Sequence, residues 1–116
     1  MKRLDPAPPP ILVDTREQMP YTYTGCVYGT IDTGDYSLDG FEHRVAIERK
    51  SLGDMLGCIG QSRERFEREL ARLAELDWAA VVVEATWEQV LTDVTYCQIH
   101  RNARLGTLLA WQVRYA

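Results

Sequence analysis

Residues 78–85, with the sequence WAAVVVEA, constrain the fold more than any other part of the chain. A strand with one face in water alternates apolar and polar residues, whereas this run is apolar at nearly every position. It therefore predicts a β-strand that is buried on both faces. A strand of that kind belongs in the interior of a sheet, so we expect it to be central.

The rest of the pattern supplies partners for such a sheet. Further strands are expected at residues 11–13, 21–24, 26–31 and 44–49, where β-branched and aromatic residues dominate. Helices are expected from a capping box at Ser51 and Asp54, and over residues 62–76, 87–91 and 102–115. Strands followed by helix, strand and helix predict an α/β domain with a mixed central β-sheet flanked by helices.

Length and composition favour a single domain. The chain has 116 residues, of which 46% are hydrophobic, and four of its five prolines lie in the first ten positions. We expect a flexible Pro-rich lead-in at residues 1–9 and one domain over residues 10–116. No apolar stretch is long enough to span a bilayer, and the N-terminus lacks the apolar core of a signal peptide. A soluble, cytoplasmic protein with no membrane partner is therefore expected.

The cysteines and the net charge limit the class of protein to which the chain can belong. Cys26, Cys58 and Cys97 are odd in number and widely spaced, which fits buried thiols better than a zinc site or a disulfide framework. The formal net charge of −4 argues against nonspecific adhesion to nucleic acid, because phosphate binding draws on many lysines and arginines. Any nucleic-acid contact must then come from local clusters of arginine.

The sequence Glu48-Arg49-Lys50, at the end of an expected strand, is the strongest sign of chemistry. Because alternate side chains of a strand point to opposite faces, Glu48 and Lys50 share one face and Arg49 points to the other. Asp35, in an expected turn, would add a second carboxylate, and two carboxylates commonly bind a hard divalent cation. Lys50 would then lie beside the attacking water. The alternative is a solvated strand face with a weak ion pair.

Three motifs carry a family resemblance. They are VDTRE at residues 13–17, GDY at residues 34–36 and ERKSLGDML at residues 48–56. Their order and spacing resemble the XPF/Hef family of structure-specific nucleases, and the resemblance extends over nearly the whole chain. It implies a restriction-endonuclease-like core of the PD-(D/E)XK kind. Such a core hydrolyses DNA phosphodiesters with Mg2+ or Mn2+ near junctions between single and double strands.

The same resemblance assigns roles to individual residues. The expected metal ligands are Asp35 and Glu48, with Asp14 as a further acidic ligand or a group behind the ligands. Lys50 is expected to orient or activate water. Arg49, Arg16 and Glu17 are expected to support the site. Asp54 belongs to the family motif, although capping of a helix explains it equally well.

Arginines at the start of the helix over residues 62–76 are candidate nucleic-acid contacts. Gln61, Arg63 and Arg65 lie nearest the expected active end, so they are the preferred contacts to the DNA backbone. The alternative for these arginines is a solvated helix face with i,i+4 pairs to neighbouring glutamates.

The last helix carries two further expectations. Asn102 is expected to cap it, and a role at the site for His100 and Asn102 is the alternative. The resemblance also implies a homodimer formed through terminal helices. Trp111, Leu108 and Tyr115 are therefore expected to be exposed, for want of that partner or of the strand and helix with which the family core normally continues.

Together these features predict a Mg2+- or Mn2+-dependent endonuclease that cuts branched or flapped DNA in repair or recombination. We expect a bacterial or phage protein that is nucleoid-associated or phage-encoded. Two alternatives stay open: a catalytically silent DNA-binding or dimerisation module, and another PD-(D/E)XK nuclease such as a junction resolvase. Family members commonly carry a helix-hairpin-helix domain, and none follows Tyr115. We therefore expect a minimal or truncated version.

Overall fold

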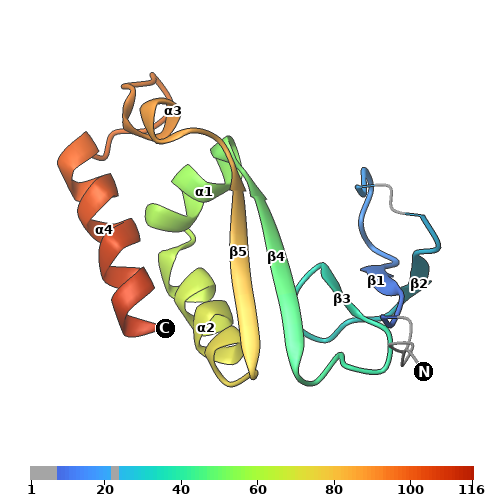
Figure 1. The fold of residues 1–116 in the computed structure, drawn as a ribbon. Coiled ribbons are helices and arrows are strands. Elements are labelled where there is room, and N and C mark those ends of the chain that lie inside the picture. Colours follow the sequence, from blue (N-terminus) through green and yellow to red (C-terminus); the bar gives the residue numbers. More distant parts are fainter. Residues whose placement is uncertain (1–7, 22–23) are drawn as a thin grey trace, which may run out of the picture.

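The computed structural model describes residues 8–21 and 24–116 (Figure 1). Most of the expected flexible lead-in, at residues 1–7, lies outside the described residues. Within the described part of the chain, no helix is both long and apolar enough to cross a membrane.

The first four strands precede all the helices in the described chain, and the fifth strand lies between the second and third helices. The strands are β1 (Ile11–Asp14), β2 (Val27–Gly29), β3 (Tyr36–Leu38), β4 (Val45–Ser51) and β5 (Trp78–Glu84). The helices are α1 (Leu52–Ile59), α2 (Arg63–Ala74), α3 (Trp87–Leu91) and α4 (Arg101–Arg114).

The segment between β1 and β3 departs from the expected strands. Tyr21 and Thr24 lie outside any strand, and residues 22–23 are not among those described. The strand expected over residues 26–31 is shortened to β2. The reason is that the Ile31 N–H donates to the Asp14 carboxylate at 2.8 Å, so Ile31 turns inward and leaves the sheet.

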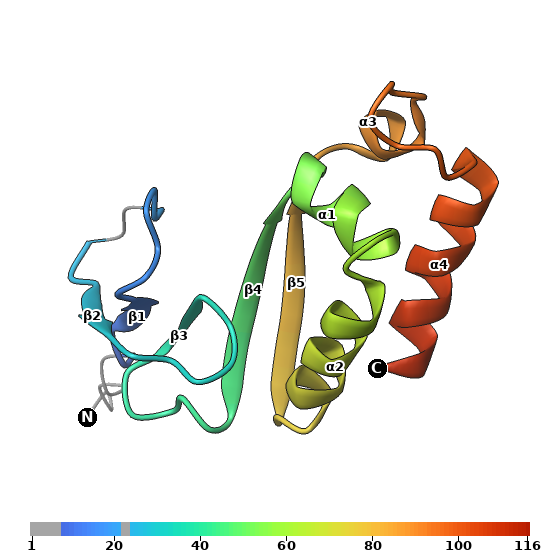
Figure 2. The ribbon, with the colours of Figure 1, turned by 180° about the vertical axis from the view of Figure 1, so that it is seen from behind.

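The five strands form one mixed sheet in the order β2-β1-β3-β4-β5. The pairs β1–β2 and β4–β5 are parallel, whereas β1–β3 and β3–β4 are antiparallel. Figures 1 and 2 show α1, α2 and α4 beside the β4–β5 pair, on the side away from β1 and β2. The predicted α/β domain with a mixed sheet flanked by helices is confirmed.

β5 lies at the edge of the sheet, so the prediction of a central strand is wrong. Within the described residues β5 pairs with β4 alone. Val81 and Val83 pack against the helical core, whereas Trp78 and Val82 are 55% and 41% exposed. An apolar run shows that both faces are chemically suited to burial, but it does not show that both are covered. For that reason the hydrophobic pattern predicted a central position for a strand that lies at the edge.

Helix α2 supplies the centre of the core. Its apolar stripe of Phe66, Leu70 and Leu73 is buried, as the spacing predicts. Trp111 of α4 packs edge-on against Phe66, with the ring centroids 5.2 Å apart. Trp111 is therefore buried, and the expectation that it is open to a partner is wrong. Its ring is used inside the chain to close the core between α2 and α4.

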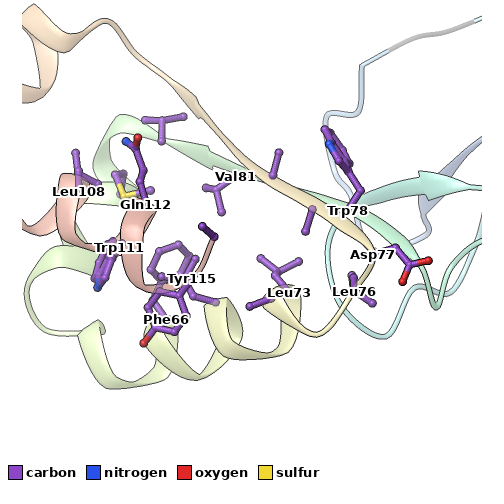
Figure 3. A pocket seen from close by; sticks show the side chains of 17 residues that line it. Phe66, Leu73, Leu76, Asp77, Trp78, Val81, Leu108, Trp111, Gln112 and Tyr115 are labelled. Atoms are coloured by element: carbon purple, nitrogen blue, oxygen red, sulfur yellow. The ribbon is translucent and has the colours of Figure 1, made fainter.

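An apolar groove of about 560 Å³ runs between α2, β5 and α4 (Figure 3). Leu73, Val81, Leu108 and Tyr115 are among the residues that line it. Leu108 and Tyr115 are half-buried along this groove, so they are more covered than the sequence suggested. The charged residues expected at the active site do not line it.

The three cysteines are free thiols in the structure. Cys58 is buried in the core, as expected, whereas Cys26 and Cys97 are half-buried. The prediction of buried thiols is therefore confirmed for Cys58, whereas Cys26 and Cys97 are only partly buried.

Side-chain hydrogen bonds cap the first turns of α1 and α4. Ser51 Oγ accepts the N–H of Asp54 at 3.2 Å, which is one half of the predicted capping box. Asp54 itself is exposed. At α4 the cap is His100 and not Asn102, because His100 Nδ1 accepts the Asn102 N–H at 3.1 Å. An imidazole one position before the helix is better placed for this bond than the predicted asparagine.

Gly34 permits the close approach of the β3 segment to β4. Its φ is +97°, and an added Cβ would lie 2.9 Å from the Cβ of Ala46. Only glycine adopts this backbone without strain in so little space. The approach lets the Asp35 N–H donate to Ile47 O at 2.8 Å, which sets Asp35 beside β4.

We expect Gly34→Ala to lower the free energy of unfolding by about 2 to 4 kcal/mol, because a left-handed backbone cost adds to a steric clash. Gly40→Ala is the matched control. Its φ is +85°, but nothing lies within 4 Å of an added Cβ. It should cost only about 1 kcal/mol. Urea denaturation measures both variants, and equal losses would contradict the steric role of Gly34.

Candidate active site

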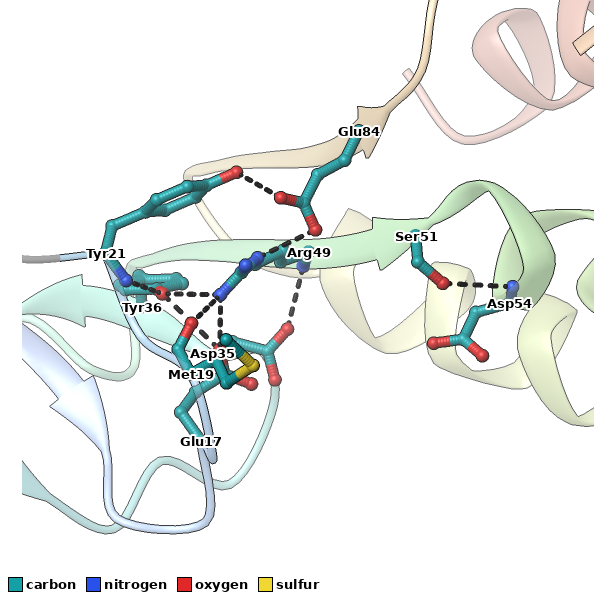
Figure 4. Close-up of polar contacts among 9 residues, drawn as sticks. All are labelled: Glu17, Met19, Tyr21, Asp35, Tyr36, Arg49, Ser51, Asp54 and Glu84. Carbon is teal, nitrogen blue, oxygen red and sulfur yellow. Dashed lines mark hydrogen bonds and ion pairs between the residues drawn. The ribbon is translucent and has the colours of Figure 1, made fainter. Parts of the chain in front are cut away.

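Backbone hydrogen bonds fix Asp35 beside β4. Its N–H donates to Ile47 O at 2.8 Å, and its carbonyl oxygen accepts the Asp14 N–H at 2.9 Å. Its Oδ2 accepts the Arg49 N–H at 2.7 Å, so the side chain lies along β4 (Figure 4). The carboxylate is thereby held within electrostatic reach of Glu48.

Glu48 and Lys50 lie together on one face of β4, as strand alternation predicts. Lys50 Nζ is 3.4 Å from Glu48 Oε1 and 5.4 Å from the centroid of the Phe66 ring on α2. Glu48 is 7% exposed. Because α2 shields the pair from solvent, the alternative of a solvated strand face does not describe it.

Glu69 of α2 completes this cluster, and sequence reasoning did not find it as a site residue. Its carboxyl is hydrogen-bonded with that of Glu48, and its charge acts on Lys50. The available signal was its position three residues after Phe66, beside the buried stripe of α2. In the sequence, Glu69 reads instead as a surface partner for neighbouring arginines.

Burial raises the pKa of Glu48 to about 9, and the hydrogen bond to Glu69 and the charge of Asp35 add to this effect. The charge of Lys50 acts in the opposite direction. Burial would lower the pKa of Lys50, but the charges of Glu48 and Glu69 outweigh it and the pKa is raised. At neutral pH the metal-free site therefore holds a Lys50 ammonium beside a protonated Glu48.

Asp14 has a different environment. Arg16 donates to the two oxygens of its carboxylate at 2.8 and 2.9 Å, and the Ile31 N–H donates at 2.8 Å. The hydrogen-bonded Arg16 guanidinium holds the pKa of this carboxyl well below its usual range. These bonds shape the turn after β1. Asp14 would have to exchange them in order to bind a metal ion, and that role stays a prediction.

Arg49 leaves β4 on the face opposite Glu48 and joins three parts of the chain (Figure 4). Its Nε donates to Glu84 Oε1 at 2.8 Å, and its Nη1 lies 3.3 Å from Glu17 Oε2. Its guanidinium stacks over the Tyr21 ring at 4.2 Å. The predicted catalytic role of Arg49 remains untested, and these contacts are those of a positioning residue.

The expected DNA contacts fall into two groups. Gln61 and Arg65 are exposed near the start of α2. Arg63 instead ties α2 to α4, because its Nη1 donates to Thr107 Oγ1 at 3.3 Å. Within α2 its Nε also lies 3.8 Å from Glu67 Oε1. Gln61 and Arg65 are therefore freer than Arg63 to contact a nucleic acid.

Asp35 and Glu48 offer oxygen ligands suited to a hard cation. Asp35 Oδ2 accepts the Arg49 N–H, which leaves Oδ1 for another partner. Among residues 8–21 and 24–116, no group of three or more His, Cys, Asp or Glu side chains is arranged to hold a metal ion. Mg2+ is commonly bound by one or two carboxylates with several waters. The residues present fit that pattern, provided that Glu48 gives up its proton.

The fold and the site together define a class. A mixed sheet with helices beside β4 and β5 carries Asp35, Glu48 and Lys50 on and next to one strand. This is an α/β domain with a mixed five-stranded sheet and flanking helices. The family model of the ERCC4 domain matches residues 13–116. The chain belongs to the ERCC4 domain family.

Solved structures with a similar fold include one of XPF from Aeropyrum pernix and one of XPF from Aeropyrum pernix in complex with DNA. The TM-scores are 0.70 and 0.67, each at 19% sequence identity. The matches cover 92% of this chain and 50% and 52% of the solved chains, so this chain spans about half the length of the structures that it matches. At this identity the likeness concerns the fold. No curated protein has a matching sequence.

We expect the metal-free domain to lose stability as the pH rises from about 5 to 9. The pKa of Glu48 is raised in the folded state from 4.5 to about 9. The stabilisation by its bound proton is therefore complete below pH 4.5 and is lost as the pH rises through 9, by at most about 1.4 kcal/mol per pH unit.

Urea denaturation across this pH range, with a chelator present, measures the effect. Glu48→Gln should flatten the profile, because its amide cannot titrate. Glu75→Gln, at an exposed position, should keep the profile of the unmodified domain. A Glu48→Gln profile parallel to that of the unmodified domain would contradict the assignment.

Proposed function

We propose that this ERCC4 domain is a divalent-metal-dependent endonuclease that hydrolyses DNA phosphodiesters at branched or flapped structures, in repair or recombination. The observation that carries the proposal is the pair of the buried Glu48 and the half-buried Lys50, 3.4 Å apart, with Asp35 held beside it. Membership of the ERCC4 domain family supports a nuclease role. The similar fold of XPF, which has been solved in complex with DNA, supports DNA as the substrate.

In this proposal Asp35 and Glu48 hold Mg2+ or Mn2+, and Lys50 orients the attacking water. When bound, the cation would supply Lewis-acid stabilisation of the charge that develops on the phosphate. The nearby positive charge would favour the ionised form of Glu48. Lys50 suits its role because an ammonium has three N–H donors, which can reach both a water molecule and a phosphate oxygen.

The surrounding residues support the site and the substrate. Gln61 and Arg65 are the proposed contacts to the DNA backbone, since both are exposed at the start of α2. Arg49 and Arg16 position the strands that carry the acidic groups. The net charge of −4 limits nonspecific affinity, so recognition must depend on the shape of the DNA as well as on phosphate contacts.

A homodimer formed through α4 is also part of the proposal. Leu109 and Val113 on this helix are 49% and 81% exposed, and each lies two residues from the buried Trp111 in the sequence. They replace Trp111 as the candidates for contact with a second copy.

A catalytically silent DNA-binding module is the rival function. The presence of the buried Glu48 beside the half-buried Asp35 and Lys50 argues against it, because burying an ionisable group costs free energy that a binding module has no need to spend. A junction resolvase would use the same chemistry on a different substrate. A panel of DNA structures separates these possibilities.

Cleavage of labelled flap, fork, four-way junction and linear duplex DNA with Mg2+ or Mn2+ tests the proposal. We expect Glu48→Ala and Asp35→Ala to lower kcat by at least about a hundredfold. Each variant lacks one proposed ligand of the metal ion, and a bound ion stabilises the transition state by several kcal/mol. Asp39→Ala removes an exposed carboxylate from the same part of the chain and should retain activity.

Calorimetric titration with Mn2+ gives an independent measurement. The unmodified domain should release or absorb heat on binding, and Asp35→Ala should abolish the signal. Unchanged cleavage by Glu48→Ala would refute the proposed site. A domain that binds DNA but neither binds Mn2+ nor cleaves any substrate would be the silent module.

A further inference from the structure

The two carboxylates of the candidate site come from halves of the sheet that separate toward the site. β3 and β4 are in register at Tyr36 and Ile47, whereas β5 stays in register with β4 as far as Glu84, the last residue of β5. Figures 1 and 2 show the end of β4 that leads into α1 beside β5 and away from β1 and β2. Glu48 lies on the β4 side of this opening, and Asp35 lies on the β3 side.

Glu84 spans the opening with its two carboxylate oxygens (Figure 4). Its Oε1 accepts the Arg49 Nε–H at 2.8 Å, within the half of the sheet that contains β4 and β5. Its Oε2 accepts the hydroxyl of Tyr21, in the segment that follows β1, at 2.7 Å. One side chain is therefore hydrogen-bonded to both halves of the sheet.

Tyr21 is itself fixed to the half of the sheet that carries Asp35. Its N–H donates to the Tyr36 hydroxyl at 2.8 Å, and the two rings stack with their centroids 5.8 Å apart. The Arg49 guanidinium lies 4.2 Å from the centroid of the Tyr21 ring. Since Tyr36 directly follows Asp35 in the chain, the position of Tyr21 is coupled to that of Asp35.

Arg49 connects the same bridge to the Asp35 carboxylate. Its backbone N–H donates to Asp35 Oδ2 at 2.7 Å, while its side chain is bonded to Glu84. The separation between Asp35 and Glu48 is therefore set by side-chain bonds as well as by strand pairing. Two carboxylates bind one cation well only when their spacing suits it, and Mg2+ in particular demands near-ideal octahedral geometry.

We propose that Glu84 is a positioning residue, which together with Tyr21 holds the two halves of the sheet at the separation that lets Asp35 and Glu48 bind one divalent cation. This inference rests on the proposed function. A carboxylate suits the task because it accepts hydrogen bonds on both oxygens at once. Glu84 pairs with Arg49 on the face of β4 opposite Glu48, so it acts on the cation through the ligands and is not one of them.

Calorimetric titration with Mn2+ tests this role in variants that keep every proposed ligand. Glu84→Ala removes both bonds, and Tyr21→Phe removes only the bond that crosses the opening. We expect each variant to raise the half-saturating Mn2+ concentration about threefold to tenfold, the factor that corresponds to one net hydrogen bond. Glu84→Gln should recover part of the affinity, because its amide still offers an acceptor to Arg49 and a donor to Tyr21.

Two matched controls and cleavage kinetics separate positioning from a general loss of structure. Glu88→Ala on α3 and Tyr96→Phe before α4 change exposed residues and should leave the half-saturating Mn2+ concentration unchanged. In cleavage assays Glu84→Ala should regain most of kcat at saturating Mn2+, with the KM for DNA unchanged, since the ligands and the DNA contacts remain. A loss of kcat that saturating Mn2+ does not restore would overturn the inference.

Hydrogen exchange at the Arg49 amide tests the geometry without metal or activity. This N–H donates to Asp35, so we expect it to exchange about threefold to tenfold faster in Glu84→Ala than in Glu88→Ala. Equal exchange rates in the two variants would contradict the link between Glu84 and Asp35.

The outcomes distinguish this inference from the proposed function. An unchanged half-saturating Mn2+ concentration in Glu84→Ala and Tyr21→Phe, with the signal abolished in Asp35→Ala, would overturn the role of Glu84 and leave the proposed function standing. A complete loss of the signal in Glu84→Ala would make Glu84 a metal ligand and would also overturn it. An unmodified domain that binds no Mn2+ would instead remove the proposed function, and this inference with it.

Discussion

The burial of the Glu48 carboxyl between β4 and α2 is the constraint on which the site depends. A carboxyl taken out of water is costly unless protein groups replace its hydration, and here those groups are Lys50 and Glu69. The surrounding structure keeps them in place. Gly34 lets Asp35 approach β4, and the buried apolar stripe of α2 fixes the helix that carries Glu69. A divalent cation would offset the acidic charge that these elements bring together.

The polar side chains on the two faces of β4 differ in how fully hydrogen bonds and ion pairs compensate them. On one face Arg49 is paired with Glu84 and Glu17 and stacked on Tyr21, so it binds the sheet to the segment after β1. On the other face Glu48 and Lys50 share few partners and have perturbed pKa values. A fully paired network stabilises a fold, whereas a buried and incompletely neutralised cluster is a candidate for chemistry.

Local patterns predicted much of this architecture because they depend on neighbours in the sequence. The stripe of α2, the short helix α3 and the shared face of Glu48 and Lys50 follow from helical and strand periodicity. Errors arose where a residue had two suitable environments. Trp111 has the chemistry of an interface residue or a core residue, and contact with Phe66 made it core. Asn102 and His100 can both cap a helix, and the backbone placed His100 at the cap.

The sequence by itself determined the family, the α/β class and the face of β4 that carries the acid and the lysine, because motif order and strand alternation are properties of the linear chain. Tertiary structure decided the edge position of β5, the engagement of Asp14 by Arg16 and the presence of Glu69 beside Glu48. These features depend on which faces are covered and which side chains meet across elements. Such contacts join residues far apart in sequence, where no local period can identify the partner.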